Sequence, residues 1–250
     1  MSETPTACIL IIGNEILSGR TQDANLLFLG TSLARMGIPV KEARTIPDVE
    51  EKIIAAVNEC RQKYTYIFTT GGIGPTHDDI TSAAIAKAFG VELERHEPSV
   101  KKMRERYTER LNAARLKMAY LPAGAEPIMT RVTSAPGFVM ENVHVMAGVP
   151  SIAEAMFDAV APTLKCGIPV QSRFIDAYLG EGEIAAELAI IQEMYSNVDI
   201  GSYPFFRVGK VGLSIVARGT DKDAIDAVIE RIAEIMRELG VEPVPDTELM

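Results

Sequence analysis

Three glycines and two aspartates lie close together in one short stretch of the chain. Residues 69–81 read Thr-Thr-Gly-Gly-Ile-Gly-Pro-Thr-His-Asp-Asp-Ile-Thr. Glycine lets the backbone approach a ligand without a Cβ clash, and the amide groups at the start of a helix attract anions. The stretch lacks the Gly-Lys-Ser/Thr of a Walker loop and the GxGxxG fingerprint of dinucleotide-binding proteins. We interpret it as a phosphate-binding loop of another type, whose candidate binding residues are Gly71, Gly72, Ile73, Gly74, Pro75 and Thr76.

The two carboxylates directly after this loop indicate metal chemistry. Either Asp78 or Asp79 alone could simply cap the helix that we expect to begin near residue 79. Two carboxylates beside a bound phosphate repel it, however, unless a cation lies between them. Their joint presence therefore favours a divalent metal ion. Thr81 offers a hydroxyl that can serve the same site or only its own helical turn.

A second polar cluster follows the first apolar run, at residues 13–25, Gly-Asn-Glu-Ile-Leu-Ser-Gly-Arg-Thr-Gln-Asp-Ala-Asn. A loop at this place would share the carboxyl edge of a parallel sheet with the glycine loop, and Glu15 near Asp79 would complete an oxygen-rich metal pocket. The alternative is a surface turn before a helix that Thr21 or Asp23 caps. The first interpretation makes Glu15, Asp78 and Asp79 the candidate metal ligands and catalytic residues. It also predicts ligand contacts from Gly13, Asn14 and Asp23.

The segment from residue 6 to 165 alternates short apolar runs with amphipathic stretches, which is typical of an α/β domain around a largely parallel sheet. The apolar runs predict strands at residues 8–12, 38–44, 64–70, 126–130 and 143–147. Apolar positions at helical spacing predict helices at residues 25–36, 48–62, 79–89, 97–118 and 152–160. We expect the charged helix at 97–118 to be continuous. Asp48 with Glu51 resembles a capping box for the helix at 48–62.

A candidate domain boundary lies at residues 166–169, Cys-Gly-Ile-Pro, where this pattern breaks. We therefore predict one domain over residues 1–168 and a small α+β domain over 169–250. The second part has the order strand, helix, strand, strand, helix. The predicted strands are at 173–179, 198–203 and 211–218, and the helices at 183–195 and 221–239. This order suggests a KH-like topology.

The charge distribution argues against a nucleic-acid partner. The chain has 25 Lys and Arg against 34 Asp and Glu, a net charge of −9, and residues 170–250 hold 7 basic against 15 acidic side chains. The turn at 180–183, where a KH domain would clamp RNA, reads Gly-Glu-Gly-Glu, which is not GXXG and presents two carboxylates to a phosphate. No apolar run is long enough to span a membrane and no signal-peptide pattern is present, so we expect a cytoplasmic protein with no membrane partner. The spacing of Cys8, Cys60 and Cys166 indicates free thiols.

Two motifs together resemble those of the MoaB/Mog molybdopterin-binding domain family. They are Ile-Gly-Asn-Glu-Ile-Leu-Ser-Gly at 12–19 and Thr-Gly-Gly-Ile-Gly-Pro-Thr-His-Asp-Asp-Ile-Thr at 70–81. With Ala-Pro-Gly-Phe at 135–138 and Met-Ala-Gly-Val-Pro at 146–150, they are most similar to the CinA branch, the competence/damage-inducible proteins, and to the N-terminal domain of eukaryotic FAD synthase. The resemblance covers about residues 6–165 and implies a three-layer α/β domain. It adds candidate ligand contacts from Ser134, Pro136, Gly137, Gly148 and Pro150. The basic helix at 101–117 offers a further contact at its end, where Lys117 or Arg115 could reach an anionic ligand.

The chain also departs from the CinA pattern. Thr133 and Ser134 stand where Gly and Thr are usual, Ala147 stands where Pro is usual, and Met118 replaces a common Gln. These differences concern the far end of a ligand more than its phosphate. The part after residue 169 resembles the small KH-type domain of CinA proteins, and the resemblance implies a stand-alone form without their amidase domain.

The resemblance implies two classes of function. CinA and the FAD synthase domain imply a metal-dependent pyrophosphatase acting on ADP-ribose or a related dinucleotide such as FAD, with Mg²⁺, Mn²⁺ or Co²⁺ as the metal. The wider family implies a binding or transferase role in molybdenum cofactor metabolism, with the phosphate of molybdopterin on the same loop. A non-catalytic nucleotide-binding module is the third alternative. We also expect a homodimer or higher homo-oligomer, with Leu179, Phe205 and Phe206 as contact residues.

Overall fold

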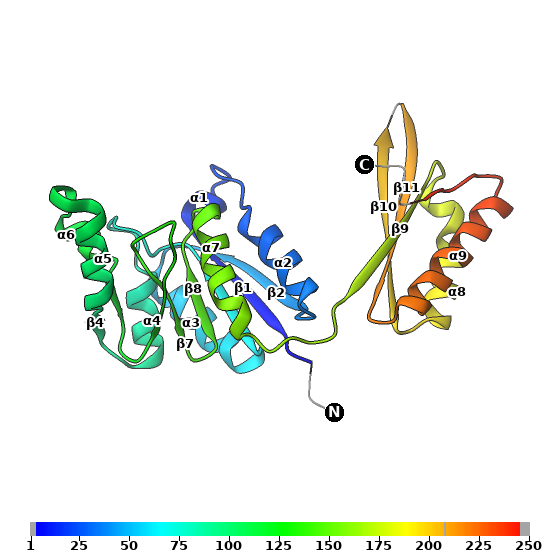
Figure 1. Ribbon diagram of the computed structural model, residues 1–250. Coiled ribbons are helices and arrows are strands. Elements are labelled where there is room, and N and C mark those ends of the chain that lie inside the picture. The colour runs from blue at the N-terminus through cyan, green and yellow to red at the C-terminus, as the bar shows by residue number, and fades with distance from the viewer. Residues whose placement is uncertain (1–3, 208, 246–250) are drawn as a thin grey trace. The chain divides into compact units, whose positions relative to one another are not determined.

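A six-stranded sheet forms the centre of the first of two compact units, which comprise residues 1–167 and 168–250 (Figure 1). A computed structural model describes residues 4–207 and 209–245 of the chain. The sheet has the order β2-β1-β3-β8-β7-β6. Strands β2 (Val40–Ile46), β1 (Ala7–Ile12), β3 (Tyr66–Thr70) and β8 (Val143–Met146) pair in parallel, whereas β7 (Gly137–Met140) pairs antiparallel with β8 and with β6 (Glu126–Ile128). The predicted α/β domain with a largely parallel sheet is confirmed.

Helices cover both faces of this sheet, which gives the domain three layers. Strand β1 has the sequence Ala-Cys-Ile-Leu-Ile-Ile and is buried along its whole length. Its even-numbered residues pack with α3 (Glu50–Lys63) and α4 (Thr81–Phe89), and its odd-numbered residues pack with α2 (Asn25–Arg35) and α7 (Pro150–Val160). A strand that is buried on both faces is a continuous apolar run, which explains why the sequence predicts it so clearly.

The segment between α4 and β6 forms a separate lobe, residues 93–122, which we call the α5–α6 lobe. It contains β4 (Leu93–Arg95), α5 (Glu97–Tyr107), the 3-10 helix η1 (Thr108–Arg110), α6 (Ala113–Lys117) and β5 (Tyr120–Pro122). The predicted continuous helix at 97–118 is therefore wrong. Thr108 adopts a φ of +48°, which ends α5. Asn112 then caps α6 by accepting a 2.9 Å hydrogen bond from the Arg115 amide.

The predicted capping box at the start of α3 is also wrong. The N-cap residue of α3 is Val49, which provides no side-chain hydrogen bond. Asp48 Oδ2 instead accepts a 2.8 Å hydrogen bond from the Asn14 amide, at the start of α1 (Asn14–Leu17). Asp48 therefore joins two loops at the same edge of the sheet, and a local sequence pattern cannot reveal such a long-range contact.

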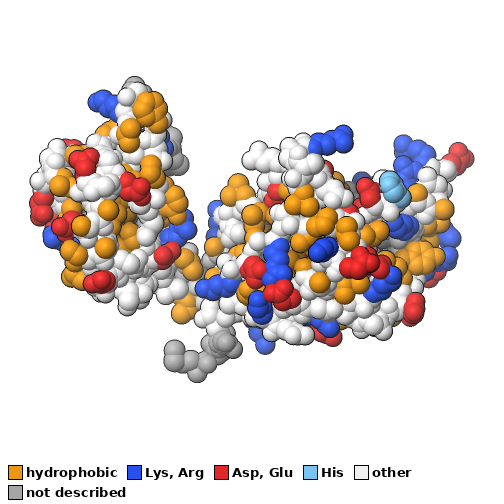
Figure 2. All heavy atoms as spheres, turned by 180° about the vertical axis from the view of Figure 1, so that it is seen from behind, with side chains coloured by type: hydrophobic (Ala, Val, Ile, Leu, Met, Phe, Trp, Pro, Cys, Tyr) orange, Lys and Arg blue, Asp and Glu red, His pale blue; other side chains and the backbone are white. Residues whose placement is uncertain are grey.

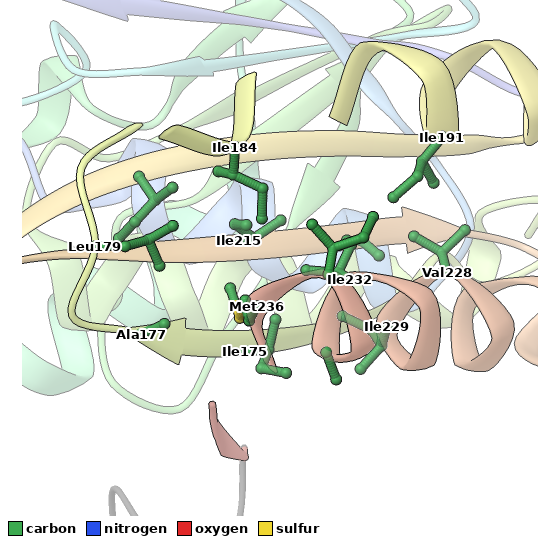
Figure 3. Packing of buried hydrophobic residues seen from close by; sticks show 14 of the residues in the cluster. Ile175, Ala177, Leu179, Ile184, Ile191, Ile215, Val228, Ile229, Ile232 and Met236 are labelled. Atoms are coloured by element: carbon green, nitrogen blue, oxygen red, sulfur yellow. The ribbon is translucent and has the colours of Figure 1, made fainter. Parts of the chain in front are cut away.

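The second unit is an antiparallel sheet packed on two helices. Its elements are β9 (Gln171–Ala177), α8 (Glu181–Met194), β10 (Val198–Arg207), β11 (Lys210–Gly219), α9 (Lys222–Glu238) and β12 (Val244–Pro245), and the strand order is β10-β11-β9-β12. Figure 3 shows Ile184 and Ile191 of α8 and Ile232 of α9 packed over Ile215 of β11. The predicted order of strand, helix, strand, strand, helix is confirmed, and the short strand β12 was not predicted.

The surface of the second unit corrects one predicted contact residue. Leu179 is only 5% exposed and belongs to the core of the unit, so it cannot be an exposed contact. Phe206 is 71% exposed, whereas Phe205 lies half-buried with the Arg207 guanidinium 4.5 Å from its ring centroid. Figure 2 shows hydrophobic side chains near the tip of the β10–β11 hairpin and acidic side chains spread over the unit.

All three cysteines are free thiols. Cys8 and Cys60 are buried with their Sγ atoms 3.5 Å apart, and burial raises the pKa of both thiols above the usual value. They are therefore protonated at neutral pH and pack as part of the core. Within the described ranges, no helix has both the length and the apolar sequence that a membrane span requires.

Candidate functional site

A cavity of about 600 Å³, which we call the main cavity, opens at the carboxyl ends of the parallel strands. Segments that follow β1, β3 and β8 form most of its wall, because the carboxyl ends of parallel strands meet at one edge of a sheet. These wall residues are Glu15, Thr21, Gly71, Gly72, Ile73, Gly74, Pro75, Asp79, Ala147, Gly148, Val149, Pro150 and Ile152. The other wall residues are Tyr107, Arg115 and Met118 of the α5–α6 lobe, together with Thr133 and Ala135.

At two positions of the loop, neighbouring atoms lie so close that only glycine fits. Gly71 has a φ of +102°, and a Cβ atom there would lie 2.1 Å from the Ile12 carbonyl oxygen. Gly72 has a φ of +69°, and a Cβ atom there would lie 2.1 Å from Thr81 Oγ1. The Thr81 hydroxyl donates to the Gly71 carbonyl at 3.0 Å, and the Thr81 amide donates to the Gly72 carbonyl at 2.9 Å. Thr81 is fully buried and therefore shapes the loop from behind.

Thr76 contacts the side chains of both aspartates. Asp79 Oδ2 accepts hydrogen bonds from the Thr76 amide at 2.8 Å and from its hydroxyl at 2.5 Å, and Asp78 Oδ1 also lies 2.5 Å from that hydroxyl. A hydroxyl has one proton, so it can donate to only one of the two carboxylates at a time. The hydrogen bond from Thr76 lowers the pKa of Asp78, which favours its ionised form. Helix α4 begins without a side-chain cap, so neither aspartate has the capping role.

Two acidic residues, Glu15 and Asp79, line the main cavity, whereas Asp78 does not. The Glu15 carboxylate folds over Gly13, where a Cβ atom would lie 2.6 Å from both of its oxygens. In the part of the chain that the structure describes, no three His, Cys, Asp or Glu side chains are grouped so that they could hold a metal ion. Enzymes commonly hold Mg²⁺ through one or two carboxylates plus the phosphates of the substrate. Glu15 and Asp79 beside the glycine loop fit such a site, in which substrate phosphates supply the remaining metal ligands.

The α5–α6 lobe brings two cationic side chains to this region. Lys117 Nζ donates hydrogen bonds to the carbonyl oxygens of Thr76 at 2.9 Å and Asp79 at 2.7 Å, which fixes the loop to the lobe. The Arg115 guanidinium lies over the Tyr107 ring, 4.8 Å from its centroid, and both residues line the main cavity. Arg115 therefore adds a cationic residue to the wall of the cavity that Glu15 and Asp79 also line.

Several predicted site residues lie outside the main-cavity wall. Asp23 precedes Ala24, the N-cap residue of α2, and its Oδ2 accepts a 2.7 Å hydrogen bond from the Leu26 amide in the first turn. Ser134 is buried, and its hydroxyl has no hydrogen-bond partner among the described residues. The predicted residues that do not line the main cavity are Gly13, Asn14, Asp23, Thr76, Asp78, Thr81, Lys117, Ser134, Pro136 and Gly137.

The sequence predicted few of the residues that the α5–α6 lobe contributes to the cavity wall. Tyr107 reaches the cavity because the chain breaks at Thr108, and no local pattern indicated that break. Arg115 was predicted only as an alternative to Lys117, from its place at the end of the basic segment 101–117. The wall residues missing from the prediction are Thr21, Tyr107, Met118, Thr133, Ala135, Ala147, Val149 and Ile152.

Known families match both units of the chain. The family described as "probable molybdopterin binding domain" matches residues 8–166, and the family described as "FAD synthase, middle domain" matches residues 169–244. A protein of Aeropyrum pernix is 34% identical over 261 residues, covering 96% of this chain and 97% of the relative. A protein of Pyrobaculum arsenaticum is 33% identical over 250 residues, covering 92% and 94%. These relatives therefore extend over both units.

A solved structure shares the fold of the first unit. It is the crystal structure of the protein CinA, of unknown function, from Thermoplasma acidophilum, with a TM-score of 0.61 and 32% identity over 64% of this chain and 98% of that one. The predicted resemblance to the CinA branch is confirmed. Because the family match at residues 8–166 covers more than half of its length, the chain belongs to the family of probable molybdopterin binding domains.

Proposed function

We propose that the chain is a metal-dependent pyrophosphatase that cleaves ADP-ribose or a related dinucleotide such as FAD. The observation that carries this proposal is the main cavity, in which Glu15 and Asp79 lie beside the glycine loop. A loop that binds phosphate through its backbone and two carboxylates that bind a cation are the two requirements of such a reaction. The match of residues 169–244 to an FAD synthase domain supports a dinucleotide substrate.

The residues of the cavity have separate roles in this reaction. The glycine loop binds one phosphate of the substrate, and Arg115 offsets the negative charge of the other. Glu15 and Asp79 would hold the divalent cation, which polarises the pyrophosphate and activates water when it is bound. Thr76 and Lys117 hold Asp79 in place, through its carboxylate and its carbonyl respectively. Hydrolysis of ADP-ribose then yields AMP and ribose 5-phosphate.

The alternative function is molybdopterin binding, which the family description of residues 8–166 favours. Molybdopterin carries a phosphate and a planar ring system, so the glycine loop could hold its phosphate in the same way. In that case the two carboxylates would serve a cation without pyrophosphate cleavage.

Product analysis distinguishes these alternatives. Purified protein is incubated with ADP-ribose, FAD or adenylated molybdopterin, each with Mg²⁺, Mn²⁺ or Co²⁺ and with a chelator. We expect metal-dependent release of AMP from ADP-ribose or FAD. Release of AMP from adenylated molybdopterin alone would assign the chain to molybdenum cofactor metabolism, and binding without any cleavage would make it a non-catalytic module.

A further inference from the structure

Asn25 is a buried polar residue that the proposed reaction does not use. It ends the polar cluster at residues 13–25 and begins α2, and only 4% of its surface is exposed. Asparagine near the start of a helix commonly accepts a hydrogen bond from a backbone amide of the first turn. Asp23 already does so in α2, because its Oδ2 accepts from the Leu26 amide. The Asn25 side chain makes a different contact.

This contact is with the wall of the main cavity. Asn25 Nδ2 donates a 2.9 Å hydrogen bond to the carbonyl oxygen of Gly148, which lies 123 residues later in the chain. Gly148 lines the main cavity shortly before α7. Helices α2 and α7 pack on the same face of the sheet, where the rings of Phe28 and Phe157 meet edge to face. The hydrogen bond therefore joins the start of α2 to the segment that leads into α7.

Gly148 in turn lies against the glycine loop. A Cβ atom at Gly148 would lie 3.3 Å from the Gly71 Cα atom and 3.8 Å from the Gly71 nitrogen, so little space separates the two backbones. The Gly71 amide also donates a 3.1 Å hydrogen bond to the carbonyl oxygen of Met146, two residues before Gly148. Residues 146–148 therefore support Gly71, and a shift of Gly148 would remove part of that support.

The oxygen of the Asn25 amide indicates that this contact lowers stability instead of raising it. Oδ1 is buried and has no hydrogen-bond partner among the described residues. A buried acceptor without a partner destabilises the folded state, whereas leucine has a similar branched shape and no polar atom. Gly148 is exposed, so water can satisfy its carbonyl oxygen in the absence of the asparagine. What asparagine provides here is a fixed position for Gly148.

We propose that Asn25 is a positioning residue, which holds Gly148 against Gly71 and so keeps the glycine loop in the shape that binds phosphate. Asn25 does not line the main cavity, so it acts through the wall and not by contact with the substrate. The inference rests on the proposed phosphate site and adds a residue outside the wall on which that site depends. The loop binds phosphate before and during the reaction, so a loss of its shape raises KM more than it lowers kcat.

Asn25→Leu and Asn142→Leu form a matched pair that tests this role. Asn142 Nδ2 also donates to backbone carbonyl oxygens, those of Arg61 and Tyr64 at 3.0 Å, but Asn142 lies outside the cavity wall. With Mg²⁺ present, we expect Asn25→Leu to bind ribose 5-phosphate about tenfold more weakly in calorimetry. Its KM for ADP-ribose should rise about tenfold while kcat stays within about twofold. Its midpoint of unfolding in urea should stay the same or rise.

Asn142→Leu should show the opposite behaviour, because it removes two hydrogen bonds far from the cavity wall. We expect a lower midpoint of unfolding with unchanged affinity for ribose 5-phosphate and unchanged KM. If Asn25→Leu behaves in the same way as Asn142→Leu, Asn25 has only a structural role and the proposal is wrong. Failure of the unmodified protein to bind ribose 5-phosphate would also overturn it, since the phosphate would then not lie on the loop.

Gly148→Ala disturbs the same contact from the other side, because its Cβ atom would press on Gly71. It should also weaken ribose 5-phosphate, and the double variant with Asn25→Leu should bind no more weakly than the weaker single variant. Additive losses would show that Asn25 does not act through Gly148. AMP release is measured separately. Weaker binding in Asn25→Leu without any cleavage by the unmodified protein refutes the pyrophosphatase alone, and cleavage with equal affinities in both proteins refutes the positioning role alone.

Discussion

Lys117 donates a 2.7 Å hydrogen bond to the carbonyl oxygen of Asp79, which lies 38 residues earlier in the chain. The bond goes to the main chain of Asp79 and leaves its carboxylate directed to Thr76 and the main cavity. Lys117 therefore positions the acidic loop without neutralising the carboxylate through direct side-chain pairing. A sequence pattern shows a basic residue at 117, but it does not show that this residue binds backbone oxygens.

Replacing Lys117 tests this positioning role. Lys117→Met keeps the apolar stem and removes both hydrogen bonds, so the loop should lose its fixed position and kcat/KM for AMP release should fall by roughly 10- to 100-fold. The melting temperature should change little, because the ammonium group is exposed. Lys101→Met, at an exposed position of α5, is the control. Unchanged kinetics in Lys117→Met would show that the loop keeps its shape without the lysine.

The two aspartates should differ in their effect on hydrolysis. Asp79→Asn keeps an oxygen that can accept the hydrogen bond from the Thr76 amide, but it removes a charge from the main cavity. We expect about a 100-fold loss of metal-dependent turnover, since polarisation by the cation is worth several kcal/mol. Asp78→Asn, outside the cavity wall, should cost clearly less. The turnover of both variants is measured at several Mn²⁺ concentrations. Equal losses of turnover in the two variants would contradict the assignment of Asp79 as a metal ligand.

Alanine substitutions at two glycines distinguish the effect of a steric clash from that of backbone strain. Gly72 and Gly90 have φ angles of +69° and +67°, but a Cβ atom at Gly72 would lie 2.1 Å from Thr81 Oγ1, and nothing lies within 4 Å of one at Gly90. Both alanine variants should therefore carry backbone strain of about 1–3 kcal/mol. Only Gly72→Ala should also displace Thr81 and abolish the binding of AMP and ribose 5-phosphate. Urea unfolding and calorimetry measure the two effects, and full ligand binding by Gly72→Ala would move the phosphate site elsewhere.

His144 should make the stability of the first unit depend on pH. The ring is 4% exposed, stacks on Phe68 with 4.9 Å between centroids, and has its pKa lowered to about 4, mainly because burial disfavours the charged form. The unfolded chain, with a histidine pKa near 6.5, binds the proton more readily, so stability is retained above about pH 6.5 and is lost as the pH falls toward 4. The histidine should contribute a loss of about 3 kcal/mol over this window.

His144→Phe keeps an aromatic ring against Phe68 and removes the titrating group. The free energies of unfolding of the unmodified protein and of His144→Phe are measured in urea at pH 7 and at pH 4. Both proteins have the same carboxylates, so the change in their difference between the two pH values reports the histidine alone. If this difference does not change with pH, protonation of His144 does not destabilise the folded state.

Self-association remains a prediction, and the structure indicates where to test it. Phe206 and Val211 are paired across the β10–β11 hairpin and are 71% and 58% exposed. We expect sedimentation velocity at micromolar concentration to show a homodimer or a larger oligomer, and Phe206→Ser to shift the distribution toward the monomer. Tyr203→Ser, on the same strand and 47% exposed, is the comparison variant. A monomer for the unmodified protein would refute the prediction.

The sequence predicted the parts of the fold that local patterns determine. Strand β1 is apolar throughout and α9 has a clear apolar stripe, so both were placed to within about two residues. The break at Thr108 and the contact from Asp48 to Asn14 were missed, because both depend on packing between distant segments. The candidate site follows the same division. The glycine loop and Asp79 are contiguous in sequence, whereas Tyr107 and Arg115 join the same cavity wall only after the lobe has folded.

The two sides of the main cavity differ in how freely evolution can change them. The close approaches at Gly71 and Gly72 allow almost no side chain, so these two positions of the glycine loop are restricted to glycine. Tyr107, Arg115 and Met118 contribute side chains from a lobe with its own small apolar cluster, and substitutions there leave the central sheet intact. Descendants of one ancestral protein could therefore keep the glycine loop and acquire new ligands through changes in the lobe alone. This division offers a route by which nucleotide and pterin specificities could diverge on the same scaffold.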